Sequence, residues 1–87
     1  MNTERELVVY SRRGCHLCEL LLAELAPLVR GRASISVRDV DDRPEWLTNY
    51  GERVPVVCFE DQEICQYELD RRAVWEILGP GPSSVKL

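Results

Sequence analysis

The sequence lacks both a long run of apolar residues and an excess of positive charge. No apolar run approaches the roughly 20 residues of a membrane-spanning helix, so we expect no membrane-embedded segment. The charged opening segment, residues 1–6, lacks the hydrophobic stretch of a signal peptide, which favours a cytoplasmic location. The net charge of −4 argues against a nucleic-acid partner, because phosphate binding needs clustered lysine and arginine.

Histidine is scarce, and cysteine is limited to four positions. His16 is the only histidine, and the cysteines are Cys15, Cys18, Cys58 and Cys65. A structural zinc site needs four ligands, normally as two closely spaced pairs. Cys58 and Cys65 are seven positions apart on predicted adjacent strands, so they complete such a site poorly. We therefore predict no metal site, and no disulfide scaffold in a reducing cytosol.

The composition predicts one folded domain. The chain has 87 residues, of which 45% are hydrophobic and 30% charged, so it can form a core, although a thin one. No internal repeat or low-complexity core segment divides it. We expect a single domain over residues 1–87, with its core within about 6–78 and a loose, turn-rich tail over 79–87.

The first third of the chain predicts a strand followed by a helix. The β-branched run over residues 6–10 is typical of a buried strand, and residues 11–14 form a polar turn. Leucines then recur about once per helical turn, which predicts a helix with a broad apolar face through Leu17, Leu21, Leu25 and Leu28. We expect Pro27 to end or kink this helix and Gly31 to stop it.

The remainder predicts three strands and two helices. We expect strands over 34–40, 56–59 and 63–66, a helix over 45–50, and a helix capped by Asp70. The segment 41–44 offers an acidic N-cap and a proline for the first of these helices. Because helices link the first three strands, we expect parallel crossovers there, whereas the turn at 60–62 joins the last two strands as a hairpin.

A pair of cysteines stands where the first strand pattern ends and the helix pattern begins. Cys15 and Cys18 are separated by two residues on the first helical turn, so one short loop can close a disulfide between them. The exposed N–H groups and the positive end of the helix dipole favour a thiolate at the helix start, and the thiolate is the form that attacks disulfides. We predict a redox-active dithiol in which the more exposed Cys15 attacks and Cys18, one turn deeper, resolves.

Three neighbours of this pair carry alternative interpretations. Arg12 and Arg13 are ordinary solvated turn residues, or they favour the thiolate of Cys15 by their charge. His16 is an exposed helix-start residue, or its partly protonated imidazole stabilises the thiolate and makes the dithiol more oxidising. We include Arg13 and His16 among the candidate substrate-binding residues.

These residues resemble the glutaredoxin-like branch of the thioredoxin fold. The segments Leu7–Ser11 and Gly14-Cys15 are similar to that family's first strand and active-site loop, and the likeness spans residues 6–78. It is nearest to short bacterial glutaredoxin-like proteins with Cys-His-Leu-Cys. The resemblance implies an α/β, thioredoxin-like (glutaredoxin-type) fold of order β-α-β-α-β-β-α, with a four-stranded mixed sheet and helices on both faces.

The resemblance also implies an activity and a substrate groove. It implies a thiol–disulfide oxidoreductase, active in electron transport, that uses Cys15 and Cys18. Val54 and Pro55 fall where the family places a cis-proline facing the dithiol, which leaves the Val54 backbone free to pair with an extended substrate. The expected partners are protein or small-molecule disulfides and thiols, and we expect a cytoplasmic monomer.

The sequence departs from the family at two places that concern glutathione. His16 and Leu17 stand where glutaredoxins carry Pro-Tyr, and Cys65-Gln66 stands where they carry a Gly-Gly pair after the fourth strand. Side chains at the latter positions obstruct a close approach to the backbone. We predict no bound cofactor and weak binding of glutathione as a co-substrate.

Two other classes of function stay open at this stage. The domain could be a non-catalytic redox-sensing or partner-binding module, or, less favoured, an iron–sulfur or zinc carrier that uses Cys15 from two chains. The roles of Cys58 and Cys65 also have alternatives. They lie opposite each other if the turn is at Asp61-Gln62, or diagonally on one face if it shifts by one residue, and we favour small buried hydrophobic side chains.

Overall fold

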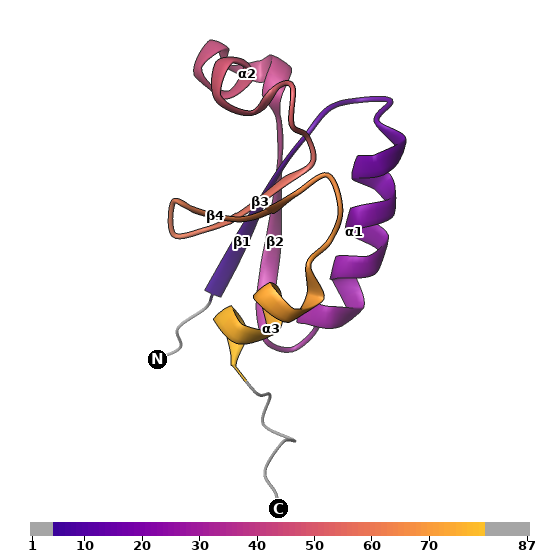
Figure 1. Ribbon diagram of the computed structural model, residues 1–87, viewed down its shortest axis with the longest axis vertical. Coiled ribbons are helices and arrows are strands. Elements are labelled where there is room, and N and C mark those ends of the chain that lie inside the picture. The colour runs from indigo at the N-terminus through magenta and orange to yellow at the C-terminus, as the bar shows by residue number, and fades with distance from the viewer. Residues whose placement is uncertain (1–4, 80–87) are drawn as a thin grey trace, which may run out of the picture.

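A computed structural model describes residues 5–79 as a four-stranded sheet with three α-helices (Figure 1). The elements are β1 (Arg5–Ser11), α1 (His16–Val29), β2 (Ala33–Asp39), the 3-10 helix η1 (Val40–Asp42), α2 (Pro44–Tyr50), β3 (Val56–Phe59), β4 (Gln62–Gln66) and α3 (Arg71–Leu78). The strand order is β2-β1-β3-β4. The predicted element order and the mixed sheet are confirmed.

The direction of β3 differs from the parallel crossover expected from the sequence. β1 pairs with β2 in parallel, but β3 runs antiparallel to β1, with Tyr10 opposite Val56. α2 has seven residues and is about 10 Å long, whereas the seven-residue β2 spans about 23 Å. The helix is too short to return the chain to the start of the sheet, so β3 begins at the end where β2 finished (Figure 1).

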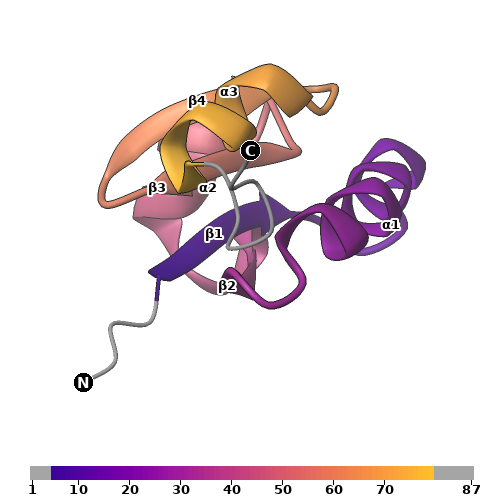
Figure 2. The same cartoon turned by 90° about the horizontal axis from the view of Figure 1, so that it is seen from below.

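The sheet separates two clusters of buried side chains. α1 and α3 pack on one face, where the buried residues are Leu7, Val9, Leu21, Leu25, Val29, Val57, Val74 and Leu78. On the other face Trp46 and Tyr50 of α2 pack against Tyr10, Val40, Val56 and Cys58. The view from below shows α1 and α3 as two separate helices beside the strands (Figure 2). α1, which begins next to the cysteine pair, is thereby anchored in the larger cluster.

Helix α1 continues past the proline that was expected to end or kink it. Pro27 lies inside α1, which ends at Val29, followed by Gly31 at a positive φ of 79°. Proline cannot donate to the carbonyl four residues back, but burial of Leu25 and Val29 in the larger cluster offsets that loss. The predicted stop near Gly31 is correct.

The acidic segment before α2 does not cap that helix, contrary to the sequence-based expectation. Asp39 accepts a hydrogen bond from the N–H of Asp41 at 2.9 Å and thereby caps η1. The N-cap of α2 is Arg43, which makes no side-chain capping hydrogen bond, and Pro44 occupies the first turn as predicted. The carboxylate of Asp41 is therefore free for another partner.

The hairpin places Cys58 and Cys65 on opposite faces of the sheet. Cys58 pairs with Glu63, whereas Val57 pairs with Cys65, and a register irregularity lies between Val57 and Cys58. Both arrangements considered for the cysteines are therefore wrong, because the bulge moves Cys65 to the face opposite Cys58. Cys58 is buried in the smaller cluster, and Cys65 packs partly buried against the larger one.

Asp70 caps α3 as predicted, since its carboxylate accepts a hydrogen bond from the N–H of Ala73 at 3.0 Å. The predicted loose tail lies, apart from Gly79, outside the described residues. Across residues 5–79, none of the helices combines the length and the apolar character needed to cross a membrane.

Candidate redox site

The segment between β1 and α1 is a tight turn that delivers Cys15 to the start of the helix. The N–H of Cys15 donates to the carbonyl of Arg12 at 3.2 Å, and Gly14 has a φ of 74°. A residue with a side chain is strained at this left-handed conformation, so glycine suits the turn. Cys15 then has extended backbone angles and is the N-cap of α1.

The two cysteines of the site are joined as a disulfide and differ strongly in burial. Cys15 and Cys18 are bonded, with 5.2 Å between their Cα atoms. The N–H of Cys18 donates to the Sγ atom of Cys15 at 3.1 Å. Cys15 is partly exposed, whereas Cys18 is only 1% exposed. Cys15 is therefore the accessible member of the pair, and its sulfur already receives a backbone hydrogen bond.

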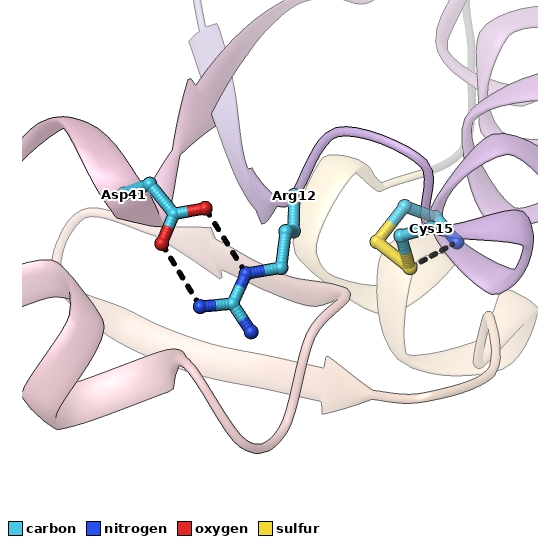
Figure 3. Close-up of a disulfide and its surroundings, with 4 residues drawn as sticks. Arg12, Cys15 and Asp41 are labelled. Atoms are coloured by element: carbon cyan, nitrogen blue, oxygen red, sulfur yellow. Dashed lines mark hydrogen bonds and ion pairs between the residues drawn. A yellow bond between two sulfur atoms is a disulfide. The ribbon is translucent and has the colours of Figure 1, made fainter.

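Arg12 is paired with an acid and points away from the disulfide (Figure 3). Its Nη2 and Nε atoms donate to the two carboxylate oxygens of Asp41 at 2.9 and 3.1 Å. The hydrogen bond from Arg12 holds the pKa of the Asp41 carboxyl below its usual value, and the same bond raises the pKa of Arg12. The ion pair links the turn over residues 12–15, hereafter the redox turn, to η1. It also offsets the positive charge of Arg12, which from the sequence alone was a candidate stabiliser of the Cys15 thiolate.

Arg13 and His16 lie beside the disulfide on the exposed side. The Arg13 side chain is 91% exposed, and its Nε atom is 3.8 Å from a carboxylate oxygen of Asp39, too far for a hydrogen bond. His16 is exposed at the first position of α1. Both side chains are free to meet a molecule that approaches Cys15.

The segment Val54-Pro55 lies at the same end of the sheet as the redox turn. The register pairs Tyr10 with Val56, so Pro55 lies next to the end of β1, where the redox turn begins. The Val54–Pro55 peptide bond is cis, Pro55 is fully buried, and Val54 is partly exposed. Among residues 5–79, no backbone hydrogen bond engages the N–H or the carbonyl of Val54. The structure therefore brings the six candidate site residues to one end of the sheet.

The two remaining cysteines are set apart from this site by their environment. Burial raises the pKa of the thiols of Cys58 and Cys65, and the carboxylate of Glu63 adds to the effect at Cys58. Both thiols are therefore protonated at neutral pH and react slowly as nucleophiles. In the described part of the chain, no cluster of three or more histidine, cysteine or acidic residues is arranged to hold a metal ion.

Sequence reasoning missed two features of the site. It did not find Asp41 as the partner of Arg12, because the pairing joins residues 29 positions apart. It also assigned Leu17 to the apolar helix face, but Leu17 is 47% exposed, whereas Leu21 and Leu25 on the same stripe are buried. The only signal in the sequence for the exposure of Leu17 was its position between the two cysteines of a redox motif.

Comparison with known proteins agrees with the geometry. The family model described as Glutaredoxin-like domain (DUF836) matches residues 6–79. The solution structure of protein Ne2328 from Nitrosomonas europaea has 36% identity and a TM-score of 0.80, over 91% of this chain and 96% of that one. The X-ray structure of protein XcR50 from X. campestris has 32% identity and a TM-score of 0.62, over 85% of this chain and 99% of that one.

A more distant structure supports the fold alone. Thioredoxin 1 from Thermosipho africanus TCF52B has 17% identity and a TM-score of 0.58, over 84% of this chain and 93% of that one. The search of curated proteins gave no match. The thioredoxin-like fold class and the glutaredoxin-like resemblance inferred from the sequence are confirmed.

Proposed function

Because the chain belongs to the Glutaredoxin-like domain (DUF836) family, we propose that it is a thiol–disulfide oxidoreductase that uses Cys15 and Cys18. The observation that carries the proposal is the difference in burial between the two bonded cysteines at the start of α1. Cys15 is accessible and accepts the N–H of Cys18, whereas Cys18 is 1% exposed. The helix dipole and this N–H favour a thiolate on Cys15 when the disulfide is reduced.

The reaction consists of two thiol–disulfide exchanges. The Cys15 thiolate attacks one sulfur of a substrate disulfide, forms a mixed disulfide and releases the other substrate sulfur as a thiolate. The Cys18 thiolate then attacks the Cys15 sulfur, closes the Cys15–Cys18 disulfide and releases the second substrate thiolate. The substrate gains two electrons, and an external thiol reductant must return them to the protein.

We assign the remaining candidate residues to substrate binding. Arg13 and His16 lie on the exposed side of Cys15, and Val54 forms the facing side of the substrate groove, where the buried Pro55 supports it. The proposed substrates are protein or small-molecule disulfides, handled by a cytoplasmic monomer without a bound cofactor. A redox-sensing module with the same fold would keep the disulfide couple but exchange slowly.

A redox titration of the purified protein, followed by mass mapping of blocked thiols, tests the proposal. We expect one two-electron transition that belongs to Cys15 and Cys18, while Cys58 and Cys65 stay reduced because they lie on opposite faces of the sheet and cannot pair with each other. Turnover of a disulfide substrate with dithiothreitol separates an enzyme from a sensor. A bridge that involves Cys58 or Cys65 in place of this pair would move the redox centre elsewhere.

Glutathione is expected to bind with a dissociation constant of about 1 mM or weaker. Cys65 and Gln66 carry side chains where a close backbone approach would be needed, and the Gln66 amide oxygen already accepts a hydrogen bond from Arg53 at 2.8 Å. Arg12, which could attract an anion, is paired with Asp41. Calorimetry with glutathione and a glutathione-coupled mixed-disulfide assay measure this. Micromolar binding with fast glutathione-dependent turnover would show an ordinary glutaredoxin.

A further inference from the structure

A groove of about 340 Å³ lies beside the start of α1, on the side of the segment that joins β4 to α3. Five of its eight lining residues are apolar or aromatic: Leu17, Leu20, Leu21, Tyr67 and Leu69. Its volume lies within the range of ligand pockets.

Half of the large exposed apolar side chains of residues 5–79 line this groove. Among residues 5–79, six large hydrophobic side chains are exposed, and three of them line it: Leu17 and Leu20, each 47% exposed, and Tyr67, 44% exposed. The other three lie on β2, α2 and α3 and do not line it. Clustered apolar exposure on a small domain is typical of a binding surface, since folding alone does not stabilise it.

Two lining residues of the groove are direct neighbours of the two halves of the redox site. Leu17 stands between the two bonded cysteines. On the opposite wall, the N–H of Tyr67 donates to the carbonyl of Pro55 at 2.8 Å. A molecule bound to the Cys15 sulfur and the Val54-Pro55 segment can therefore extend toward the groove.

The free backbone groups of Val54 favour a polypeptide as the occupant. An extended chain offers N–H and carbonyl groups that can pair with those of Val54, and no described residue competes for them. Successive side chains of an extended chain alternate in direction, so a residue close to the substrate cysteine can point into the groove. A small disulfide without side chains would leave the groove empty.

The charges of the groove favour a polypeptide over glutathione. Arg71 lies 3.8 Å from Glu24, so these two charges offset each other, and Glu68 adds a negative charge to the lining. Glutathione carries two carboxylates and one ammonium group, so its net charge is negative, like that of the groove. An apolar or basic side chain complements this lining.

We propose that this groove binds a side chain of a substrate polypeptide next to its oxidised cysteine and selects apolar residues there, and basic over acidic ones. The inference rests on the proposed function, because the substrate disulfide must exchange with Cys15 as described above. It adds the substrate class, extended polypeptide disulfides with an apolar neighbour, and names Leu20 and Tyr67 as residues that determine specificity.

The test compares disulfide-bonded peptides that differ only at the residue beside the cysteine: leucine, lysine, glycine or glutamate. Oxidised glutathione and bis(2-hydroxyethyl) disulfide serve as small substrates, with dithiothreitol as the reductant. For the wild-type protein we expect kcat/KM about tenfold higher for the leucine peptide than for the glycine peptide, mainly through KM, and lysine above glutamate. Leu20→Gln is expected to reduce the leucine preference to about twofold or less.

Leu47→Gln is the matched control, because Leu47 is also exposed, at 43%, but lies on α2 outside the groove. The leucine preference should be unchanged in this variant. Equal rates for all four peptides in the wild-type protein, or an equal loss of preference in both variants, would overturn the groove as a specificity site while leaving the redox function intact. A preference for oxidised glutathione over every peptide would assign the groove to glutathione. If neither peptides nor small disulfides are reduced, the proposed function fails and the inference fails with it.

Discussion

Replacing Cys15 by serine is expected to reduce disulfide turnover on the order of a thousandfold or more. Of the two bonded cysteines, only Cys15 at the start of α1 can be reached by an external disulfide, because Cys18 is 1% exposed. A serine hydroxyl is not ionised at neutral pH and cannot form the mixed disulfide. Steady-state turnover of a disulfide substrate with dithiothreitol measures the loss.

Cys18→Ser is expected to give a different defect. The Cys15 thiolate can still attack, but no thiol is placed to release the substrate, so the mixed disulfide accumulates. Intact-protein mass spectrometry should show the added mass of one substrate half. If Cys15→Ser captures substrate and Cys18→Ser does not, the two roles are reversed.

Cys65→Ser is the matched control for both variants. Cys65 is a partly buried thiol of β4 whose pKa is raised by burial, and it lies outside the redox turn. We expect turnover close to that of the wild-type protein. A comparable loss of turnover in Cys65→Ser would mean that replacing any cysteine impairs the protein. The losses in Cys15→Ser and Cys18→Ser would then not identify the redox pair.

Leu25→Ala is expected to lower the free energy of unfolding by about 2–5 kcal/mol. Leu25 is fully buried between α1 and the sheet, so its truncation removes apolar contacts and leaves a cavity. The loss is a large part of the roughly 5–15 kcal/mol that stabilises a typical domain. Urea denaturation of the oxidised protein, followed by circular dichroism, measures it.

Leu47→Ala provides the comparison at an exposed leucine, where we expect a change within about 0.5 kcal/mol. A cost below about 1 kcal/mol for Leu25→Ala would mean that the site closes around the smaller side chain. Under conditions where both variants are folded, their redox midpoint should match that of the wild-type protein, because neither residue lines the redox turn.

The candidate site could be predicted from the sequence because its chemistry is local. The two cysteines, the glycine at positive φ and the helix that follows lie within a few consecutive residues, and short spacings constrain geometry strongly. The patterns of β1 and α1 were equally readable, because both segments carry apolar residues that are buried in the fold. Val54-Pro55 required the resemblance to a family, since its neighbours in space are far away in the chain.

The features that the sequence did not predict depend on contacts between residues far apart in the chain, on a single irregular residue, or on the length of a connecting helix. The partner of Arg12 is 29 residues away, and Asp41 looked like a helix cap because aspartate suits both roles. The register of the hairpin changed at one bulge, which was enough to move Cys65 to the other face. The direction of β3 was missed because a helical connection suggests a crossover, and only the helix length argues against it.

By itself, the sequence determined the order of the elements, the apolar face of α1, the buried run of β1 and the dithiol at the start of a helix, because each follows from spacing over a few residues. The tertiary structure decided which side chains remain exposed. Leu17 and Leu25 share one helical stripe, but only Leu25 meets the sheet, and the wall facing Leu17 comes from Tyr67 and Leu69 after β4. Periodicity shows which apolar side chains share a helix face. Whether the fold covers them or leaves them exposed to a partner depends on elements that pack against that face from elsewhere in the chain.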